Sequence, residues 1–394
     1  MKGKKRINSV CFFGTYESSF PRTITLKEAC RQLRIKAIDC HLPFWELKRE
    51  KLEFFSLASM IKIVFQLVFI YIRLTSRYFR LEDHQAVIVG YNGYFDMAVA
   101  RALTKIRKKN LIFTPVFPLY ETAIEDRQYV NQNSLKAKII HLIDTTSCRL
   151  ADLVLIETQT YLDYYCQEFN LPEEKFFKIP LGADESNYAP QPRKGLKNES
   201  TLRVLFYGKF IPLQGIPTIV EAAKFLERHE DIAFEVIGSG QLTPTIQDLA
   251  QKLKIRNVSF IDWVNYHDLP LHIQAADICL GIFGTTHKAR RGIPIKVYES
   301  LAMKKPVITG STPAAREVFT DKVDCVLCET GNPEALAEAI LLLKENEHLR
   351  EDIAAAGYRL YQRLFSSEQI AKKFELALNA CHNRKNHPRM KTGK

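Results

Sequence analysis

The 394-residue sequence lacks the signatures of several large functional classes. It has no P-loop, no HExxH and no GxSxG, so the usual motifs of phosphate-loop enzymes, zinc proteases and serine hydrolases are missing. Gly238-Ser239-Gly240 is a lone GxG without a third glycine, which argues against a dehydrogenase. No zinc-finger, RRM or helix-turn-helix pattern occurs, and the basic charge therefore does not indicate a nucleic-acid partner.

The cysteines lack the spacing of a disulfide framework. There are nine of them, an odd number, spread over a long chain, which argues for a reducing compartment. Cys325 and Cys328 form one CxxC with no second pair or histidines nearby, so a core strand is favoured over a zinc site. No small-residue cleavage site follows the strand-like segment Ile7–Phe13, so we expect no signal peptide and a cytoplasmic protein.

Acidic residues are scarce in the first 150 positions only. Residues 1–150 hold 25 Lys/Arg against 13 Asp/Glu, whereas residues 151–394 hold 31 of each, so the net charge of +12 lies entirely in the first part. The last eleven residues, 384–394, carry five bases and no acid. A basic half attracts an anionic partner such as phospholipid, nucleic acid or a phosphorylated substrate. Composition alone does not choose among them.

What the sequence does have is a regular alternation of strand-like and helix-like segments. In the first half, strands are expected at Ile7–Phe13, Lys36–Cys40, Val87–Val89, Leu111–Pro115 and Asp152–Ile156, and helices at Thr23–Arg34, Tyr94–Lys108, Ser134–Leu150 and Thr160–Phe169. In the second half, strands are expected at Leu202–Tyr207, Ala233–Ile237, Val258–Phe260, Ile278–Ile282, Val307–Thr309 and Val323–Leu327, and helices at Ile216–Arg228, Thr243–Leu253, His267–Ala275, Ile295–Met303 and Pro333–Glu345. Such alternation predicts parallel sheets covered by helices.

The segment Ala183–Ser200 interrupts this rhythm with two prolines, a glycine and two asparagines, and we interpret it as a linker. The predicted fold class is α/β, with two Rossmann-like, doubly wound domains that face each other across a cleft. The expected division is an N-terminal domain over 1–185, a linker over 186–200, a C-terminal domain over 201–365, and a C-terminal helix and basic tail over 366–394. That last helix is expected to return to the N-terminal domain. Ligands of open parallel sheets bind at the carboxyl ends of the strands.

One long apolar segment, Phe54–Leu74, does not fit the alternation. About 20 apolar residues span a bilayer, but Lys62 lies within this segment and a charge near the middle of a span is costly. At 100° per residue, one narrow stripe holds the polar and basic positions Ser59, Lys62, Gln66, Arg73, Arg77 and Arg80. Two interpretations stay open: a core helix with one solvated edge, or a helix at an anionic membrane surface.

Two segments carry the functional signal. In Val204–Ala222 a strand ends at Gly208, Lys209 follows, and Gln214-Gly215 precede a helix. Glycine allows close backbone approach, and a helix start with a lysine beside it can hold a diphosphate. In Arg290–Ala302, Lys296 and Glu299 lie one turn apart on a helix, where a carboxylate can bind the hydroxyls of a ribose. An ordinary turn and a solvated ion pair are the competing explanations.

Together these segments resemble the family-4 retaining glycosyltransferases of GT-B fold. Their C-terminal domains carry a glycine-lysine loop and a later E-x7-E motif followed by a KPV-type strand, here Lys305–Gly310. Further segments of the same family pattern are Pro180–Asp184, Phe234–Gly240, Val258–Val264, Ala275–Ile282 and Asn332–Ala339. The resemblance covers the second domain and is looser in the first.

The resemblance implies a donor site for a nucleotide diphosphate sugar. That site comprises Gly14, Gly208, Lys209, Gln214, Gly215, Asp262, Trp263, Gly292, Ile293, Pro294, Lys296, Val297 and Glu299, with Lys209, Arg291 and Glu299 as the catalytic groups. Lys209 would hold the diphosphate and Glu299 the ribose. Glu121, Asp126 and Arg127 would line the side of the acceptor, a saccharide or a lipid-linked sugar. No metal or other cofactor is implied.

Two positions depart from the family pattern. Gln214 replaces the usual lysine of the loop, and Arg291 replaces the first glutamate of E-x7-E. The loss of a lysine removes a phosphate charge, and we expect Arg291, beside Lys288 and Arg290, to restore it. The expected function is retaining transfer of a sugar to an acceptor hydroxyl in polysaccharide or glycolipid synthesis, at the inner face of the membrane if the protein attaches there. The same departures keep a second interpretation open, a catalytically inactive binding or partner subunit.

Overall fold

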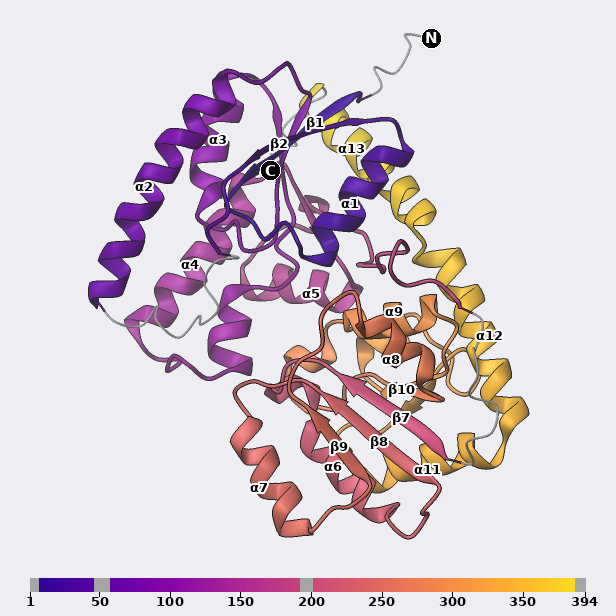
Figure 1. The fold of residues 1–394 in the computed structure, drawn as a ribbon. Coiled ribbons are helices and arrows are strands. Elements are labelled where there is room, and N and C mark those ends of the chain that lie inside the picture. Colours follow the sequence, from indigo (N-terminus) through magenta and orange to yellow (C-terminus); the bar gives the residue numbers. More distant parts are fainter. Residues whose placement is uncertain (1–6, 46–56, 192–200, 387–394) are drawn as a thin grey trace, which may run out of the picture.

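The computed structural model describes residues 7–45, 57–191 and 201–386, which form two α/β halves (Figure 1). The first half is built on a parallel sheet of six strands in the order β2-β1-β3-β4-β5-β6. Its strands are β1 (Ser9–Gly14), β2 (Lys36–His41), β3 (Ala86–Val89), β4 (Asn110–Phe113), β5 (Leu153–Ile156) and β6 (Phe176–Lys178). Its helices are α1 (Pro21–Gln32), α2 (Leu57–Phe79), α3 (Asp96–Ile106), the π-helix η2 (Glu121–Asp126), α4 (Leu135–Leu150), α5 (Gln159–Glu168) and the 3-10 turn η3 (Glu173–Lys175).

The second half repeats this architecture with strand order β12-β11-β10-β7-β8-β9, also parallel. Its strands are β7 (Leu202–Tyr207), β8 (Ile232–Ile237), β9 (Val258–Ile261), β10 (Ile278–Leu280), β11 (Val307–Gly310) and β12 (Val326–Cys328). Its helices are α6 (Ile216–Phe225), α7 (Thr243–Leu253), α8 (Leu269–Ala275), α9 (Ile295–Ala302), α10 (Pro313–Arg316), α11 (Pro333–Glu345) and α12 (Glu347–Leu364), with 3-10 turns η4 (Pro212–Gln214) and η5 (Lys288–Arg290). The predicted fold class, two doubly wound parallel sheets, is confirmed.

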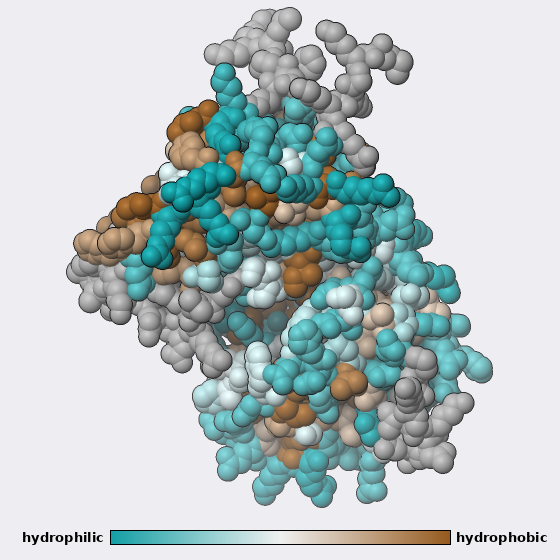
Figure 2. Space-filling view, turned by 45° about the horizontal axis from the view of Figure 1, so that its top comes forward, coloured by the Kyte–Doolittle hydropathy of each residue, from teal (hydrophilic) through white to brown (hydrophobic). Residues whose placement is uncertain are grey.

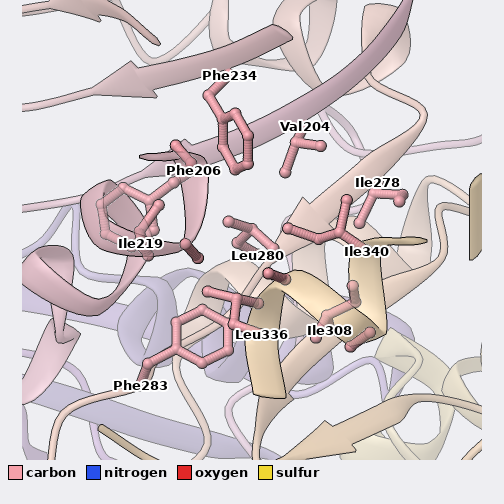
Figure 3. Close-up of a cluster of buried hydrophobic side chains, with 14 of the residues drawn as sticks. Val204, Phe206, Ile219, Phe234, Ile278, Leu280, Phe283, Ile308, Leu336 and Ile340 are labelled. Atoms are coloured by element: carbon pink, nitrogen blue, oxygen red, sulfur yellow. The ribbon is translucent and has the colours of Figure 1, made fainter. Parts of the chain in front are cut away.

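A dry core on one face of the second sheet holds this half together (Figure 3). Phe206 of β7, Leu280 of β10 and Ile308 of β11 are each no more than 1% exposed and pack against Leu336 and Ile340 of α11. The strands read as continuous apolar runs because a parallel sheet buries both of its faces. Cys325 and Cys328 lie at β12, buried and free, so the CxxC belongs to a strand, as expected.

The chain returns to the first half at its end. The long helix α12 runs along the second half, and α13 (Ser367–Asn386) packs against α1 (Figure 1). Phe374 and Leu378 of α13 share a core with Leu26 and Cys30 of α1. The domain boundaries stay predictions, because residues 192–200 and the basic tail 387–394 lie outside the described residues.

Helix α2 covers the first sheet with one face and leaves another face open. Leu67, Leu74 and Tyr78 point inward, whereas Phe65, Val68, Phe69, Ile72 and Phe79 are 48–68% exposed. Hydrophobic side chains lie among hydrophilic ones on this edge of the first half (Figure 2). None of the helices within the described ranges is long and apolar enough to cross a bilayer. In the apolar segment Phe54–Leu74, residues 54–56 and the side chain of Lys62 are not among those that the structure describes.

The packing of α13 on α1 predicts that the protein loses stability when this contact is removed. Replacing the fully buried Phe374 by alanine should lower the free energy of unfolding by about 3–5 kcal/mol, because it leaves a cavity under α1. Leu376→Ala on the same helix, where the side chain is 60% exposed, should change it by less than about 0.5 kcal/mol. Urea unfolding of both variants measures this; equal losses would contradict the packing.

Candidate active site

The loop after β7 brings its backbone unusually close to its surroundings. Gly208 and Gly215 have φ of +148° and +67°, and a Cβ on Gly215 would lie 2.3 Å from the carbonyl carbon of Phe283. Only glycine fits there, and Gly215 is also the residue that caps α6. Lys209, between them, is exposed. Strand end, glycine loop and helix start therefore meet as the sequence predicts for a phosphate-binding turn.

The lone GxG packs against this loop. A Cβ on Gly238 would lie 1.9 Å from the carbonyl oxygen of Gly208, and the Phe210 amide donates to the Ser239 carbonyl (3.0 Å). The two loops after β7 and β8 therefore touch through backbone alone, which explains the glycines without a second ligand.

Lys296 places its amine beside Gln214, the position where the loop sequence lacks the usual lysine. Its Nζ donates to Oε1 of Gln214 (2.6 Å) and lies 3.6 Å from the centre of the Phe206 ring. A Cβ on Gly208 would come within 3.0 Å of this Nζ. Lys296 is buried, and burial lowers its pKa well below the usual value while Glu299 raises it. An anion bound beside Gln214 would stabilise the charged form of Lys296.

Glu299 lies one turn further along α9 and is also buried. The hydroxyl of Tyr207 donates to its Oε2 (2.9 Å). Burial raises the pKa of Glu299 to about 7, against the lowering effects of Tyr207 and Lys296. Asp262 and Trp263, expected at the base, follow β9 and are exposed, Trp263 by 77%. Gly292 packs closely on Tyr161, Ile293 and Val297 are buried, and Pro294 precedes α9.

Gly14 ends β1 with φ of +119° and is held by a buried carboxylate. Asp96, at the start of α3, accepts from the amide (2.7 Å) and hydroxyl (2.9 Å) of Thr15 and from the hydroxyl of Tyr71 (3.0 Å). Burial raises the pKa of Asp96 to about 6. A Cβ on Gly14 would overlap Asp96, so glycine is required there for packing whether or not phosphates lie above it. Sequence reasoning missed Asp96, because a lone aspartate at a helix start looks like a cap.

Arg291 was expected to face the diphosphate, but its guanidinium pairs with carboxylates of the first half. Its NH1 donates to Oε1 of Glu121 (2.7 Å) and to Oε2 of Glu125 (2.8 Å), and its guanidinium lies 3.7 Å from the centre of the Tyr164 ring. Glu121 is fully buried. A guanidinium shared by two carboxylates leaves no charge for a diphosphate, so the expected replacement of the loop lysine by Arg291 is wrong, and Lys296 is the nearer cation.

The three residues expected on the acceptor side all contact the second half. Besides Glu121, Asp126 accepts from the hydroxyl of Thr286 (3.1 Å), and the carbonyl of Arg127 accepts from Nε2 of Gln241 (3.2 Å). Nζ of Lys288 in turn donates to the hydroxyl of Thr122 on η2 (2.7 Å). Figure 2 shows the halves in contact, with a hollow between them.

A second buried contact joins the halves behind this one. The hydroxyl of Tyr298 on α9 donates to Oε1 of Glu157, directly after β5 (2.7 Å). Burial raises the pKa of Glu157 to about 7, while Tyr298 and Arg22 lower it. Arg22 itself is fully buried and donates to the carbonyls of Ile179 and Pro180. Sequence spacing gives no signal for such contacts, since 141 residues separate Tyr298 from Glu157. Among the residues that the structure describes, no cluster of three or more potential ligands could hold a metal ion.

The second half of the chain is similar to a known family. Residues 188–360 match the family described as glycosyl transferases group 1. An uncharacterised glycosyltransferase of Methanocaldococcus jannaschii is 26% identical over 42% of this chain and 44% of its own length. A phosphatidyl-myo-inositol mannosyltransferase of Mycobacterium leprae is 24% identical over 50% of this chain and 53% of its own. The chain thus spans about half the length of these curated relatives.

Solved structures extend the likeness to both halves. Anabaena HepE, in complex with UDP-glucose, has a TM-score of 0.70 at 15% identity and covers 94% of this chain and 99% of its own. Sucrose-phosphate synthase from Thermosynechococcus elongatus has a TM-score of 0.68 at 15% identity, with coverage of 94% and 98%. At this identity the likeness establishes the architecture, which is the GT-B fold.

The ion pair between Arg291 and Glu121 predicts that the contact between the halves is sensitive to the loss of Arg291. Arg291→Met should destabilise the contact by about 3 kcal/mol, because Glu121 keeps a buried charge without its partner. Small-angle scattering should then show a larger radius of gyration, and urea should unfold the halves in separate transitions. Arg290→Met, exposed and one residue away, is the matched control and should behave like the parent.

The double variant Arg291→Met/Glu121→Gln should recover most of the loss, since the fully buried charge is gone and the remaining carboxylate, Glu125, is partly exposed. A parent-like Arg291→Met would show that the pair contributes nothing to the contact.

Proposed function

We propose that this protein transfers a sugar from a nucleotide diphosphate sugar to an acceptor hydroxyl, and the match of its C-terminal half to the group 1 glycosyl transferases supports this. The observation that carries the proposal is the meeting of Lys296, Gln214 and Glu299 at the glycine loop after β7. A cation and free amides suit a diphosphate, and a carboxylate one helical turn away suits the vicinal hydroxyls of a ribose. HepE, whose complex contains UDP-glucose, has the same architecture.

The chemical difficulty is the negative charge that builds on the diphosphate as the bond to the sugar breaks. Lys209, exposed at the loop, and Lys296 beneath it would stabilise this leaving group, together with the backbone amides that begin α6. The acceptor would enter from the first half, past Glu121, Asp126 and Arg127. Contact between the halves would exclude water and so protect the donor from hydrolysis. The proposed outcome retains the anomeric configuration of the donor.

A catalytically inactive subunit of the same fold is the second candidate, and the substitutions Gln214 and Arg291 favour it. A thermal-shift screen against UDP-, GDP- and ADP-sugars and the free nucleotides measures ligand binding independently of turnover. At a hundredfold excess over Kd a ligand stabilises the folded chain by about 2.7 kcal/mol. A stabilising nucleotide sugar that is neither transferred nor hydrolysed would support the inactive subunit.

The finer proposal on location is reversible attachment to an anionic membrane, with a lipid-linked acceptor in polysaccharide or glycolipid synthesis. The exposed apolar side chains of α2 support it, together with the exposed Arg73 and Arg77 on the same helix and Arg80 directly after it. On α4, Leu135, Ile139 and Leu142 are also exposed. Apolar side chains that enter the interface and bases that meet anionic headgroups are complementary to one membrane surface.

Glu299 provides a test of the donor site through pH. Affinity for the nucleotide sugar found in the screen should fall as the pH drops through about 7, because the protonated carboxyl cannot accept from both ribose hydroxyls. Glu299→Gln should remove this dependence and weaken binding at pH 8 by about 1.5–3 kcal/mol. Titration calorimetry from pH 6 to 8 measures both, with the exposed Glu338→Gln as control.

The same substitution should not harm the fold. Because the folded pKa of Glu299 is raised above 4.5, its contribution to stability decreases as the pH rises from about 4.5 to about 7. At pH 8, therefore, Glu299→Gln should leave the unfolding free energy unchanged or raised. Weak binding that comes with a lower melting temperature would mean that the carboxylate serves the fold instead of the ribose.

The membrane proposal predicts binding to anionic vesicles and release by salt. Each surface base should contribute on the order of 1 kcal/mol, so Arg73→Gln/Arg77→Gln/Arg80→Gln should weaken sedimentation with phosphatidylglycerol vesicles strongly. Phe69→Ser should weaken it further, through the lost apolar contact. Arg73→Gln/Arg77→Gln is compared with Lys105→Gln/Lys108→Gln, which removes the same number of exposed bases elsewhere in the first half and should change binding less. Equal binding to neutral vesicles would contradict the electrostatic part.

A further inference from the structure

A cavity of about 810 Å³ opens beside the contact between the halves. Its walls come from η2 and the loop after it, from α5, and from His287 and Arg291 of the second half. Ligand pockets of small molecules have volumes of this order. The carbonyl of Arg127 accepts from Gln241 next to this wall, and the Leu242 amide donates to the Phe210 carbonyl (2.9 Å). Hydrogen bonds thereby connect the chain next to the cavity wall to the glycine loop after β7.

The wall is rich in primary amides. Gln128, Asn131, Gln132 and Gln167 all line the cavity, and all four are exposed. An amide both donates and accepts, as a sugar hydroxyl does, so the two groups can pair in either direction. A phosphate or carboxylate needs donors alone, and a wall of this kind serves it poorly.

The charge of the wall is negative. Glu125 and Glu168, the latter beside His141, line it, and buried Glu121 lies behind it near Lys288. Arg291 is the only Lys or Arg among the lining residues that the structure describes. Arg291 is already shared by Glu121 and Glu125. An anionic ligand would therefore enter a site whose one guanidinium is occupied, and it would be repelled.

The backbone of the wall is also specialised. Glu121–Asp126 forms a π-helix, a rare conformation that occurs frequently at functional sites, and both Glu121 and Glu125 of this turn accept from the same guanidinium. Gln128, two residues after it, has φ of +53°, which a non-glycine residue seldom adopts. The surrounding contacts hold this conformation and turn the loop 128–132 along the cavity.

We propose that this cavity binds the acceptor, and that the acceptor sugar seated there is neutral or amino-substituted and carries no phosphate or carboxylate. The inference rests on the proposed glycosyl transfer and names the substrate class on its acceptor side. The excess of bases in residues 1–150 serves other contacts, because the cavity itself is acidic.

Saturation-transfer NMR on the full chain tests this with matched probes. The probes are the methyl glycosides of glucose, galactose and mannose, methyl 2-amino-2-deoxyglucoside and methyl glucuronide. At least one neutral glycoside should bind, the amino sugar should bind at least as well as the glucoside, and the glucuronide should bind about tenfold more weakly than the glucoside. No binding of any probe, or a glucuronide that equals the glucoside, overturns the proposal.

Substitutions place the binding in this cavity. Gln132→Ala and Gln167→Ala should each weaken the bound glycoside about fivefold, and Glu168→Gln should lessen the discrimination against glucuronide. Gln251→Ala on α7, exposed and far from the cavity lining, is the matched control. Unchanged glycoside affinity in all three cavity variants overturns the assignment.

The affinity for the nucleotide sugar separates this proposal from the one it rests on. The cavity variants should keep parent-like nucleotide-sugar affinity and melting temperature. A parent that binds the nucleotide sugar but no glycoside refutes the cavity alone. A parent that binds neutral glycosides in the cavity but no nucleotide sugar refutes the proposed transfer and leaves the sugar site standing.

Discussion

The arrangement of this molecule depends on one buried charge. Glu121 has no access to water, and its carboxylate is compensated by Arg291, which comes from the other half of the chain. A buried carboxylate without such a partner would be strongly destabilising, so the halves are favoured in contact at this point. The π-helix around Glu121 also presents Glu125 to the same guanidinium. This pairing joins the halves beside the cavity and occupies the guanidinium that lines it.

The pairing also decides which cation is left for a donor. With Arg291 engaged across the cleft, the lysines at the glycine loop are Lys209, on the surface, and Lys296, beneath it. Lys296 reaches Gln214, at the position where a lysine is usual in the related pattern. A lysine of the facing helix α9 thus lies beside the turn whose own sequence has glutamine at this position.

Both sheets are parallel, so each collects its loops at the carboxyl ends of its strands. A chain with two such sheets brings the loops into one site only if the halves are held at a suitable angle. Here the long α12 and the returning α13 tie the second half to α1 of the first. The contact between Tyr298 and Glu157, with Arg22 nearby, is a second link between the halves.

The sequence determined the local structure and the identity of the loop chemistry. Thr243–Leu253 and Pro333–Glu345 are helices with the predicted bounds, because apolar periodicity and helix starts are local signals. Gly215 was predictable for the same reason, since only glycine adopts its turn without strain. Tertiary structure alone decided the partners of three side chains, namely Arg291, Lys296 and Asp96. Each depends on a partner 81 or more residues away, and a charge in a sequence does not show which distant group will share its burial.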